Sequence, residues 1–213
     1  MNVQCILFGA IQLKKEEIEG KRVIEVGSSD VNGSLRPLLE TYNPKEYIGV
    51  DISAGKGVDL ICDAGDLAAK FGSRSFDVVI STELLEHVKD WRLAIHNIKD
   101  ICKPAGKLLI TTRSFGFVYH GYPSDFWRFE AEDMEYIFKD FIIEKLERDP
   151  QNGVLIKARK PENFTEIDLS EYKLYSIVAD KRIKELTDKD LHSGSFKWML
   201  YKLRVKTFLR RYI

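Results

Sequence analysis

Small and acidic residues follow each of four short apolar segments in the first half of the chain. In order, they are Gly27 to Gly33, Asp51, Asp63, and Ser81 with Thr82. If the four segments are parallel strands of one sheet, these residues meet at its carboxyl edge, where such sheets bind ligands. Glycines let the backbone approach a ligand closely, and an acid after the second strand can accept both hydroxyls of a ribose. The pattern predicts a nucleoside site.

The turn after the first segment, Gly27-Ser-Ser-Asp-Val-Asn-Gly33, indicates which nucleoside ligand suits the site. It lacks the middle glycine of the dinucleotide pattern G-x-G-x-x-G, and Asp30 stands where it would repel a phosphate. A ligand with a ribose and an adenine but no phosphate fits better, and Asp63 could accept from the adenine amino group. S-adenosylmethionine is such a ligand, and its cationic amino and sulfonium groups suit Glu25 and Asp30.

Strands alternate with helices as far as residue 160, which is typical of a mostly parallel sheet covered on both faces. We expect strands at residues 22–27, 46–51, 58–63, 75–82, 107–112, 141–149 and 153–160, and helices at 11–19, 34–42, 65–71, 90–102 and 131–141. The last two strands are separated by a short turn containing proline and glycine, which predicts a hairpin with antiparallel pairing at one edge of the sheet.

The sequence changes character near residue 161. Residues 161–170 are polar and linker-like, residues 171–190 have a helical pattern, and residues 196–213 contain six basic residues and no acid. We therefore expect a first domain at 1–160 and a helical C-terminal extension with a basic tail at 161–213. The tail could contact an anionic membrane surface or form a homodimer contact, and the alternative is a helix packed on the domain with a solvated basic face.

Composition and charge restrict the class of protein. The chain has 213 residues, of which 44% are hydrophobic and 31% charged, so a packed core is expected. Acidic and basic residues number 33 each, and a neutral molecule has no overall field that attracts nucleic acid. The three cysteines form no metal-binding pattern. Because neither a signal peptide nor a bilayer-spanning segment is apparent, we expect a cytoplasmic protein, with membrane contact at most peripheral.

As an ordered set, the motifs resemble those of the class I S-adenosylmethionine-dependent methyltransferases, in the group often labelled methyltransferase type 11. The first motif of that family is matched by VIEVGSSDVNGS, the second by YIGVDIS and the adenine-contacting motif by CDAGDL. The fourth-strand motif is matched by SFDVVISTELLEHVKDW, and the fifth strand with its preceding turn by IKDICKPAGKLLITTRS. The resemblance covers about residues 21–160, and it departs from the family at Ser29, where many members have a second glycine.

The resemblance implies an α/β fold, a Rossmann-like, doubly wound sheet of seven mostly parallel strands whose last strand is reversed. It also implies S-adenosylmethionine as the cofactor and S-adenosylhomocysteine as the product. The expected cofactor-binding residues are Glu25, Gly27, Ser28, Asp30, Gly33, Asp51, Ile52, Asp63, Ala64 and Ser81.

Two histidines are the candidate catalytic residues, because a hydroxyl acceptor needs a base to take its proton. His87 lies just beyond the fourth strand, and His120 lies in the loop after the fifth. In the family, the glutamate–histidine pair matched here by Glu86 and His87 is widespread among members with different substrates, which favours a general role for it. A purely structural role is the alternative for each histidine.

The loop after the fifth strand is rich in aromatic residues and could close over an acceptor. Family members share a Pro-x-Asp-aromatic-aromatic-Arg pattern, matched here at residues 123–128, which implies a position beside the active site and an internal ion pair for Arg128. The candidate substrate-binding residues are Tyr119, Tyr122, Asp125, Trp127 and Arg128. Packing of the loop on the sheet edge is the alternative.

The expected function is therefore methyl transfer from S-adenosylmethionine to a small-molecule or glycan acceptor. The alternatives are an RNA or protein methyltransferase and a non-catalytic methyltransferase-like binding domain. Glu83, Glu86, His87 and His120 also resemble the two-glutamate, two-histidine metal set of small-RNA 2′-O-methyltransferases, in which an ion could polarise a hydroxyl pair. Since the catalytic domain has no obvious basic face for RNA, the sequence assigns neither a nucleic-acid partner nor a metal.

Overall fold

A seven-stranded sheet forms the centre of the computed structural model, which describes residues 3–121, 124–194, 196–197 and 200–201. The strand order is β3-β2-β1-β4-β5-β8-β7. Neighbouring strands from β3 to β5 are parallel, whereas β8 runs antiparallel to both β5 and β7. The strands are β1 (Arg22–Val26), β2 (Glu46–Asp51), β3 (Leu60–Ile61), β4 (Phe76–Thr82), β5 (Cys102–Arg113), β7 (Ile142–Asp149) and β8 (Gly153–Arg159).

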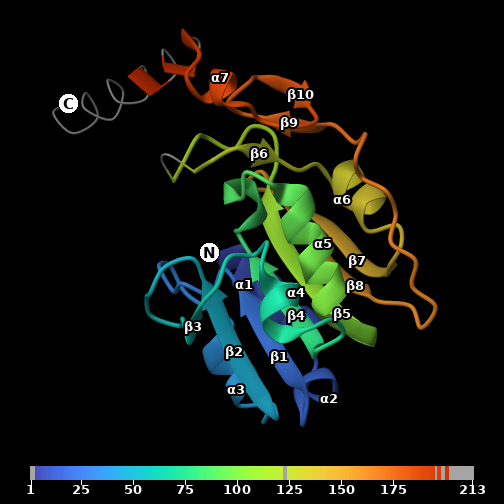
Figure 1. Ribbon diagram of the computed structural model, residues 1–213. Helices are drawn as coiled ribbons and strands as arrows, with labels where there is room; N and C mark the ends of the chain where they lie inside the picture. Colours follow the sequence, from blue (N-terminus) through green and yellow to red (C-terminus); the bar gives the residue numbers. More distant parts are fainter. Residues whose placement is uncertain (1–2, 122–123, 195, 198–199, 202–213) are drawn as a thin grey trace, which may run out of the picture.

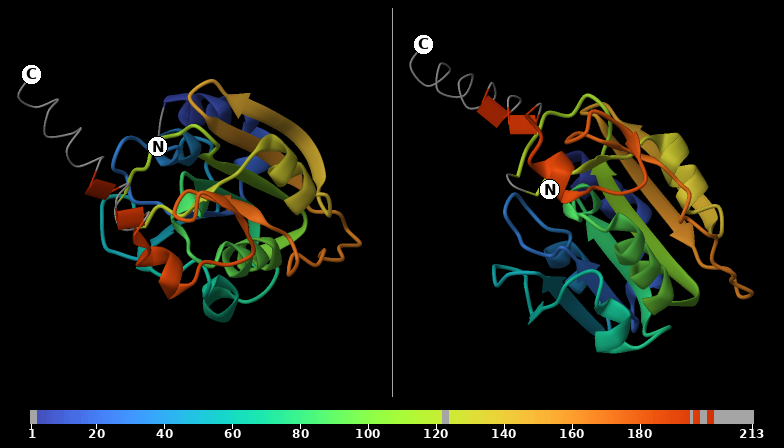
Figure 2. Two further views of the ribbon diagram at one scale, coloured as in Figure 1. Left: turned by 90° about the horizontal axis from the view of Figure 1, so that it is seen from above. Right: turned by 45° about the horizontal axis from the view of Figure 1, so that its top comes forward.

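Helices cover both faces of this sheet (Figure 1; Figure 2, left). One face carries α1 (Val3–Gln12), α2 (Lys15–Ile18) and α3 (Arg36–Glu40), and the other carries α4 (Leu67–Phe71), α5 (Trp91–Ile101) and α6 (Ala131–Ile137). Successive strand residues point to opposite faces. In β1, Val23 accordingly packs under α1 to α3, and Ile24 packs under α4 to α6. The mainly apolar strands therefore contribute side chains to two hydrophobic cores, one on each face of the sheet.

A second, smaller sheet lies above the carboxyl ends of the central strands (Figure 1). It consists of β6 (Trp127–Arg128), β9 (Leu174–Ser176) and β10 (Lys181–Ile183), in the order β10-β9-β6 with antiparallel pairing. A one-turn helix, α7 (Asp188–Leu191), follows β10, and a 3-10 turn, η1 (Leu85–His87), follows β4. The small sheet thus joins the loop after β5 to the C-terminal extension.

The expected central sheet is confirmed, including the reversed last strand and the antiparallel pairing at the β7 edge. The helix expected over residues 171–190 is wrong, because half of that segment forms β9, β10 and the turn between them. The helix expected at 11–19 is two helices, α1 and α2, and the first already begins at Val3.

The C-terminal extension packs on the rest of the chain. Apolar side chains of the extension, among them Leu169, Leu174 and Val178, are buried in the same core cluster as α5 and α6. The division into two domains at residue 161 stays a prediction. Most of the basic tail, residues 202–213, lies outside the described residues, so its membrane or homodimer contact also stays a prediction. Within the described part of the chain, no helix combines the length and apolar character needed to cross a membrane.

Candidate active site

A cavity of about 880 Å³ opens at the carboxyl edge of the central sheet. Its walls come from the turn after β1, the residues that follow β2 and β3, the end of β4 with η1, and the loop between β5 and β6. Eight of the predicted cofactor-binding residues line it: Glu25, Gly27, Ser28, Gly33, Asp51, Ile52, Asp63 and Ala64. A second cavity of about 530 Å³ shares Ile52, Cys62 and Asp63 with the first. The two cavities therefore adjoin where the adenine is expected.

The turn after β1 is shaped by glycine. Gly27 has a φ of +80°, and a Cβ atom there would lie 3.0 Å from the Cβ of Leu84. Both the left-handed backbone and the close approach of η1 therefore exclude larger residues. The next residue, Ser28, is buried at the cavity wall, and its Oγ has no hydrogen-bond partner among the described residues. Buried polar atoms without partners are uncommon in folded proteins, so a ligand atom is a reasonable partner for Ser28.

Glu25, in β1 just before this turn, places a buried carboxyl group in the lining of the cavity. Its side chain is 1% exposed and accepts a hydrogen bond of 2.8 Å from the Tyr47 hydroxyl. Burial raises the pKa of Glu25 to about 7, against the lowering effect of that hydrogen bond and of the nearby Arg36 charge. The group is therefore poised to ionise when a positive charge arrives beside it.

Two predicted cofactor-binding residues do not line the cavity. The Asp30 carboxylate accepts from Lys56 Nζ at 2.5 Å and from the Gly33 backbone N–H at 2.9 Å, so it closes the turn. The hydrogen bond from Lys56 lowers the pKa of Asp30 most. Ser81 is fully buried in β4, and its neighbour Thr82 lines the cavity instead. The sequence motif located the strand end correctly but not which of the two hydroxyl residues lines the cavity.

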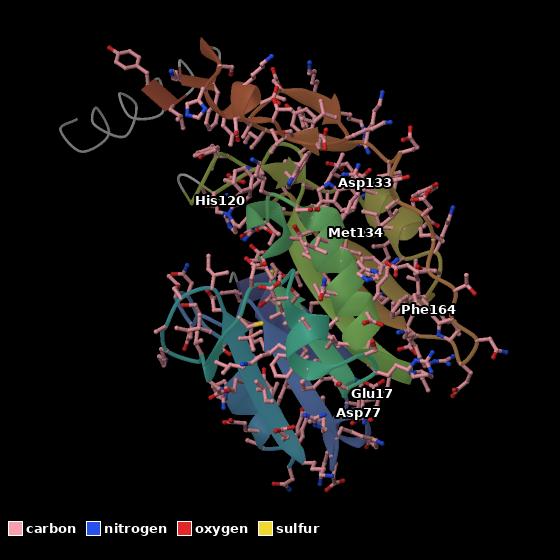
Figure 3. The ribbon with its side chains drawn as sticks, viewed as in Figure 1. Glu17, Asp77, His120, Asp133, Met134 and Phe164 are labelled. Carbon is pink, nitrogen blue, oxygen red and sulfur yellow. The ribbon has the colours of Figure 1, made fainter. Side chains whose placement is uncertain are left out.

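The two candidate catalytic histidines meet at one wall of the cavity, although they are far apart in sequence. Their rings are in edge-to-face contact with centroids 4.7 Å apart. His87 ends η1, and His120 comes from the loop between the two sheets, where Figure 3 labels it. Gly121, with a φ of +71°, brings that loop so close that a Cβ atom would lie 2.8 Å from His87 Cε1.

Hydrogen bonds fix the tautomer of each imidazole. His87 Nδ1 faces the Ser124 carbonyl, which can only accept, so Nδ1 carries the proton. His120 Nδ1 lies 3.0 Å from Asp125 Oδ2. Burial by itself would raise the pKa of Asp125, but hydrogen bonds from Arg128 and His120 outweigh it and lower the pKa to about 2. Because Asp125 is ionised, His120 Nδ1 donates, and in the neutral form of each imidazole the lone pair is therefore on Nε2.

Asp125 and Arg128 form the buried ion pair that anchors this loop. Arg128 Nη1 and Nη2 donate to the two Asp125 oxygens at 2.5 Å and 2.9 Å, and both side chains are at most 1% exposed. The same guanidinium donates to the carbonyls of Phe117, Val118 and Trp127. The internal ion pair expected for Arg128 is therefore confirmed.

The predicted substrate-binding residues have other positions than expected. The side chains of Asp125, Trp127 and Arg128 are buried in the protein interior and do not line the cavity. The Trp127 indole N–H donates to the carbonyls of Val88 and Lys89, both at 3.1 Å, so this side chain fixes the loop to η1. Tyr119 packs its ring against Phe196 and also lies off the cavity lining, while Tyr122 lies outside the described residues.

Several lining residues were not predicted, and Glu83 is the most informative of them. It follows β4 with a φ of +57°, an uncommon conformation for a residue with a side chain. Its carboxylate pairs with Arg113 from the end of β5, and burial raises the pKa of Glu83 to about 7. Thr82, which the sequence places at the ligand-binding edge, also lines the cavity, as do Leu84, Arg113, Phe117, Ser124 and Phe126. The sequence signals for this group are the position of Thr82 at a strand end and the membership of Glu83 in the candidate metal set.

Comparison with known proteins agrees with this geometry. A family model described as a methyltransferase domain matches residues 4–145. A curated relative, the ubiquinone biosynthesis O-methyltransferase of Idiomarina loihiensis, is 28% identical over 123 residues, which cover 52% of this chain and 49% of that protein. The chain thus matches about half the length of that relative.

Solved structures share the fold at low sequence identity. The 1,6-didemethyltoxoflavin-N1-methyltransferase of Burkholderia thailandensis, solved with bound 1,6-didemethyltoxoflavin and S-adenosylhomocysteine, has a TM-score of 0.58 and 13% identity over 74% of this chain and 78% of its own. The phosphoethanolamine N-methyltransferase 2 of Haemonchus contortus, solved with S-adenosyl-L-methionine, has a TM-score of 0.57 and 20% identity over 74% of this chain and 52% of its own. Together with the matched family model, the sheet order and the cavity at its carboxyl edge identify this chain as a member of the methyltransferase domain family, within the class I S-adenosylmethionine-dependent methyltransferases.

Proposed function

We propose that this protein transfers the methyl group of S-adenosylmethionine to a hydroxyl oxygen of a small-molecule or glycan acceptor. The activity and acceptor of the whole protein belong to this proposal, because the curated O-methyltransferase matches over only about half its length. The oxygen acceptor is supported by the histidines at the cavity wall, whose lone pairs could accept a hydroxyl proton.

The cavity suits S-adenosylmethionine in size and in charge. Its volume of about 880 Å³ lies within the range of small-ligand sites and leaves room for an acceptor beside the cofactor. Three lining carboxyl groups, Glu25, Asp51 and Asp63, favour a ligand that is cationic and rich in hydroxyl and amino donors. The unpartnered Ser28 Oγ would also gain a hydrogen bond. The residues present therefore fit this ligand.

Each part of the chain has a distinct task in the proposed reaction. Asp51 would accept from the ribose hydroxyls and Asp63 from the adenine amino group, while Glu25 would face the cationic methionine end. Bound S-adenosylmethionine supplies a methyl carbon on a sulfonium, which is already an activated leaving group. The chain must then align the acceptor oxygen, exclude water and receive the proton.

The observation that carries the proposal is the fixed tautomer of His120. Asp125 holds the Nδ1 proton, so in the neutral imidazole Nε2 is the acceptor, which is what a general base for a hydroxyl requires. An amine whose conjugate acid has a low pKa is already neutral and can attack through its own lone pair, so it needs no such base. Leu84, Phe117 and Phe126 add apolar surface to the same cavity, which would help to keep water from the reacting atoms.

The test is methyl transfer from labelled S-adenosylmethionine to a panel of sugars, phenols and aliphatic alcohols, with matched primary and secondary amines. Calorimetric titration with S-adenosylmethionine, S-adenosylhomocysteine and NAD precedes it. We expect binding of both sulfur ligands but not of NAD, and label on hydroxyl acceptors. Transfer only to amines would refute the oxygen acceptor, and no binding of either sulfur ligand would refute the cofactor.

A further inference from the structure

Three potential metal-ligating atoms converge at the wall of the cavity. They come from Glu86, His87 and His120, each of which offers one ligand atom within 4.8 Å of those of the other two. Glu86 Oε1 is 3.9 Å from His87 Nε2 and 3.9 Å from His120 Nε2. This separation is too long for direct hydrogen bonds. It is close to the spacing of ligands that share one ion at bond lengths of about 2.0–2.2 Å.

Both imidazoles have the hydrogen bonds that metal-binding histidines usually make. A ligating histidine donates its second ring N–H to a carbonyl or a carboxylate, which fixes the tautomer and the ring orientation. Here His87 Nδ1 donates to the Ser124 carbonyl, and His120 Nδ1 donates to Asp125. Asp125 is itself held by Arg128, so the support extends to a second layer of contacts.

Glu86 supplies an independent observation that points to a ligand. Its side chain is fully buried, and Oε2 accepts from Thr112 Oγ1 at 2.8 Å. The other oxygen, Oε1, is aimed at the two histidines and has no hydrogen-bond partner among the described residues. A buried carboxylate oxygen without a partner is costly. A cation between Oε1 and the two Nε2 atoms would remove this cost.

Glu83, the fourth residue of the sequence pattern, does not belong to this set. Its carboxylate faces Arg113, and its other contacts come from the Thr111 hydroxyl and the Cys5 thiol. The arrangement is therefore two histidines and one carboxylate, with further coordination positions open on the cavity side. Such sets bind borderline divalent ions such as Zn²⁺ and its first-row neighbours.

We propose that Glu86, His87 and His120 bind one divalent transition-metal ion, with Zn²⁺ as the reference ion, at the acceptor end of the cavity. The role of this ion rests on the proposed function, although its binding does not. With the ion bound, His120 Nε2 would be a ligand and no longer a base, and the ion would instead act as a Lewis acid that lowers the pKa of a coordinated hydroxyl. The hydroxyl proton leaves to solvent, the oxygen forms a bond to the methyl carbon, and the carbon–sulfur bond breaks with its electron pair staying on sulfur.

The test measures metal binding directly on the full-length protein, freed of affinity tags and dialysed against a chelator. Titration with Co²⁺ is followed by its visible d–d absorption, and competition with Zn²⁺ gives the affinity of the reference ion. We expect one ion per chain, bound without any need for S-adenosylmethionine. His120→Ala and Glu86→Gln should each weaken binding at least about tenfold, with circular dichroism verifying the fold of each variant.

The matched control is His96→Ala, because His96 is exposed, lies outside the cavity and has its ring Nδ1 2.8 Å from Glu166 Oε2. It should bind the ion as the parent protein does. A folded parent protein that binds no ion would overturn the proposal, as would equal binding by His120→Ala. Methyl transfer in such an ion-free protein would leave the proposed function standing, whereas ion binding without any methyl transfer would refute that function but support the site.

Discussion

Asp51 lies at the end of β2 with much of its hydrogen-bonding capacity unused. Among the described residues, its carboxylate accepts two long hydrogen bonds, from the backbone N–H groups of Ser29 and Ser53, both at 3.3 Å. Because loss of hydrogen bonds to a charged group costs about 1–3 kcal/mol, Asp51→Ala should weaken S-adenosylmethionine binding by that amount. Calorimetric titration measures the change, and Asp168→Ala, an exposed acid off the cavity, should leave affinity unaltered. Equal affinity in both variants would remove Asp51 from the site.

Glu25 should make cofactor binding depend on pH. In the ligand-free fold burial raises its pKa from 4.5 to about 7. The protonated form therefore stabilises the fold fully below pH 4.5, and this stabilisation is lost as pH rises through 7. A cationic ligand beside Glu25 favours the carboxylate and lowers its pKa, so affinity should rise with pH up to about 7, by at most about tenfold per pH unit, and level off above it.

Titration calorimetry in buffers of different ionisation enthalpy detects the proton released by Glu25 on binding. The isosteric variant Glu25→Gln should bind more weakly and lose both the proton release and the pH dependence. Tyr47, Arg36 and Asp30 also face this carboxyl group, so Tyr47→Phe, which removes one hydrogen bond to it, should keep a proton release. A pH profile that is the same in Glu25→Gln and in the parent would contradict the assignment.

Substitution of His120 should lower the rate of methyl transfer without changing the affinity for the cofactor. Its Nε2 faces the acceptor end, so His120→Ala should leave S-adenosylmethionine affinity within about twofold of the parent. Turnover on a hydroxyl acceptor should fall on the order of 10²–10⁴-fold, the usual contribution of a positioned base. Label incorporation at saturating cofactor measures this loss. Full turnover in the variant would show that His120 acts on neither the acceptor proton nor a metal ion.

At the scale of elements, the loop between β5 and β6 depends on one buried guanidinium. Removing Arg128 would leave the Asp125 carboxylate buried without its partner, which typically costs about 3–5 kcal/mol. We expect Arg128→Ala to lower the free energy of unfolding by this amount in urea denaturation. Arg148→Ala, which breaks a surface pair with Glu132, should change it by less than about 1 kcal/mol. Comparable losses in the two variants would argue against the anchoring role.

The elements predicted well from sequence are those whose signal is local. The strand expected at residues 46–51 matches β2 in both bounds, and α5 follows its apolar spacing after the cap at Asp90. The cofactor end of the site was predictable for the same reason, since Asp51 and Asp63 simply follow strands. β9 and β10 have three residues each, and β9, on which β10 pairs, is stabilised by pairing with β6, which lies far away in sequence. The hydrophobic periodicity within residues 171–190 contains no information about that pairing, so it could not predict these two strands.

For single residues in the loop between β5 and β6, the contacts likewise depend on the tertiary fold and could not be predicted from the local sequence. Trp127 and Asp125 were expected to contact substrate because aromatic and charged residues in a loop often do. Their actual contacts, the carbonyls of Val88 and Lys89 for one and Arg128 with His120 for the other, arise only when the loop folds back over η1. The converging Nε2 atoms of His87 and His120 depend on that fold-back too.

At the scale of the whole molecule, the extension contributes to a shared core. Leu169, Leu174, Val178 and Leu186 are each at most 7% exposed. Burial of each such side chain contributes about 1.5–3 kcal/mol, while a whole domain is stable by only about 5–15 kcal/mol. A chain ending at residue 160 should therefore lose its cooperative thermal transition, which calorimetry measures. A chain ending at residue 201 retains all four side chains and should keep the transition; a cooperative 1–160 fragment would contradict this view.

The small sheet also bears on how such a protein can be recombined with its relatives. β6 belongs to the loop that carries His120 and Asp125, yet Trp127 and Arg128 pair with Tyr175 and Ser176 of β9, and Ile177 donates to the Phe126 carbonyl. A chimera that exchanged only the C-terminal segment would set a foreign β9 against a native β6 and shift the histidine loop with it. Exchange of acceptor preference between relatives should therefore require the exchange of two separate segments, so that residues 114–129 travel together with residues 161–201.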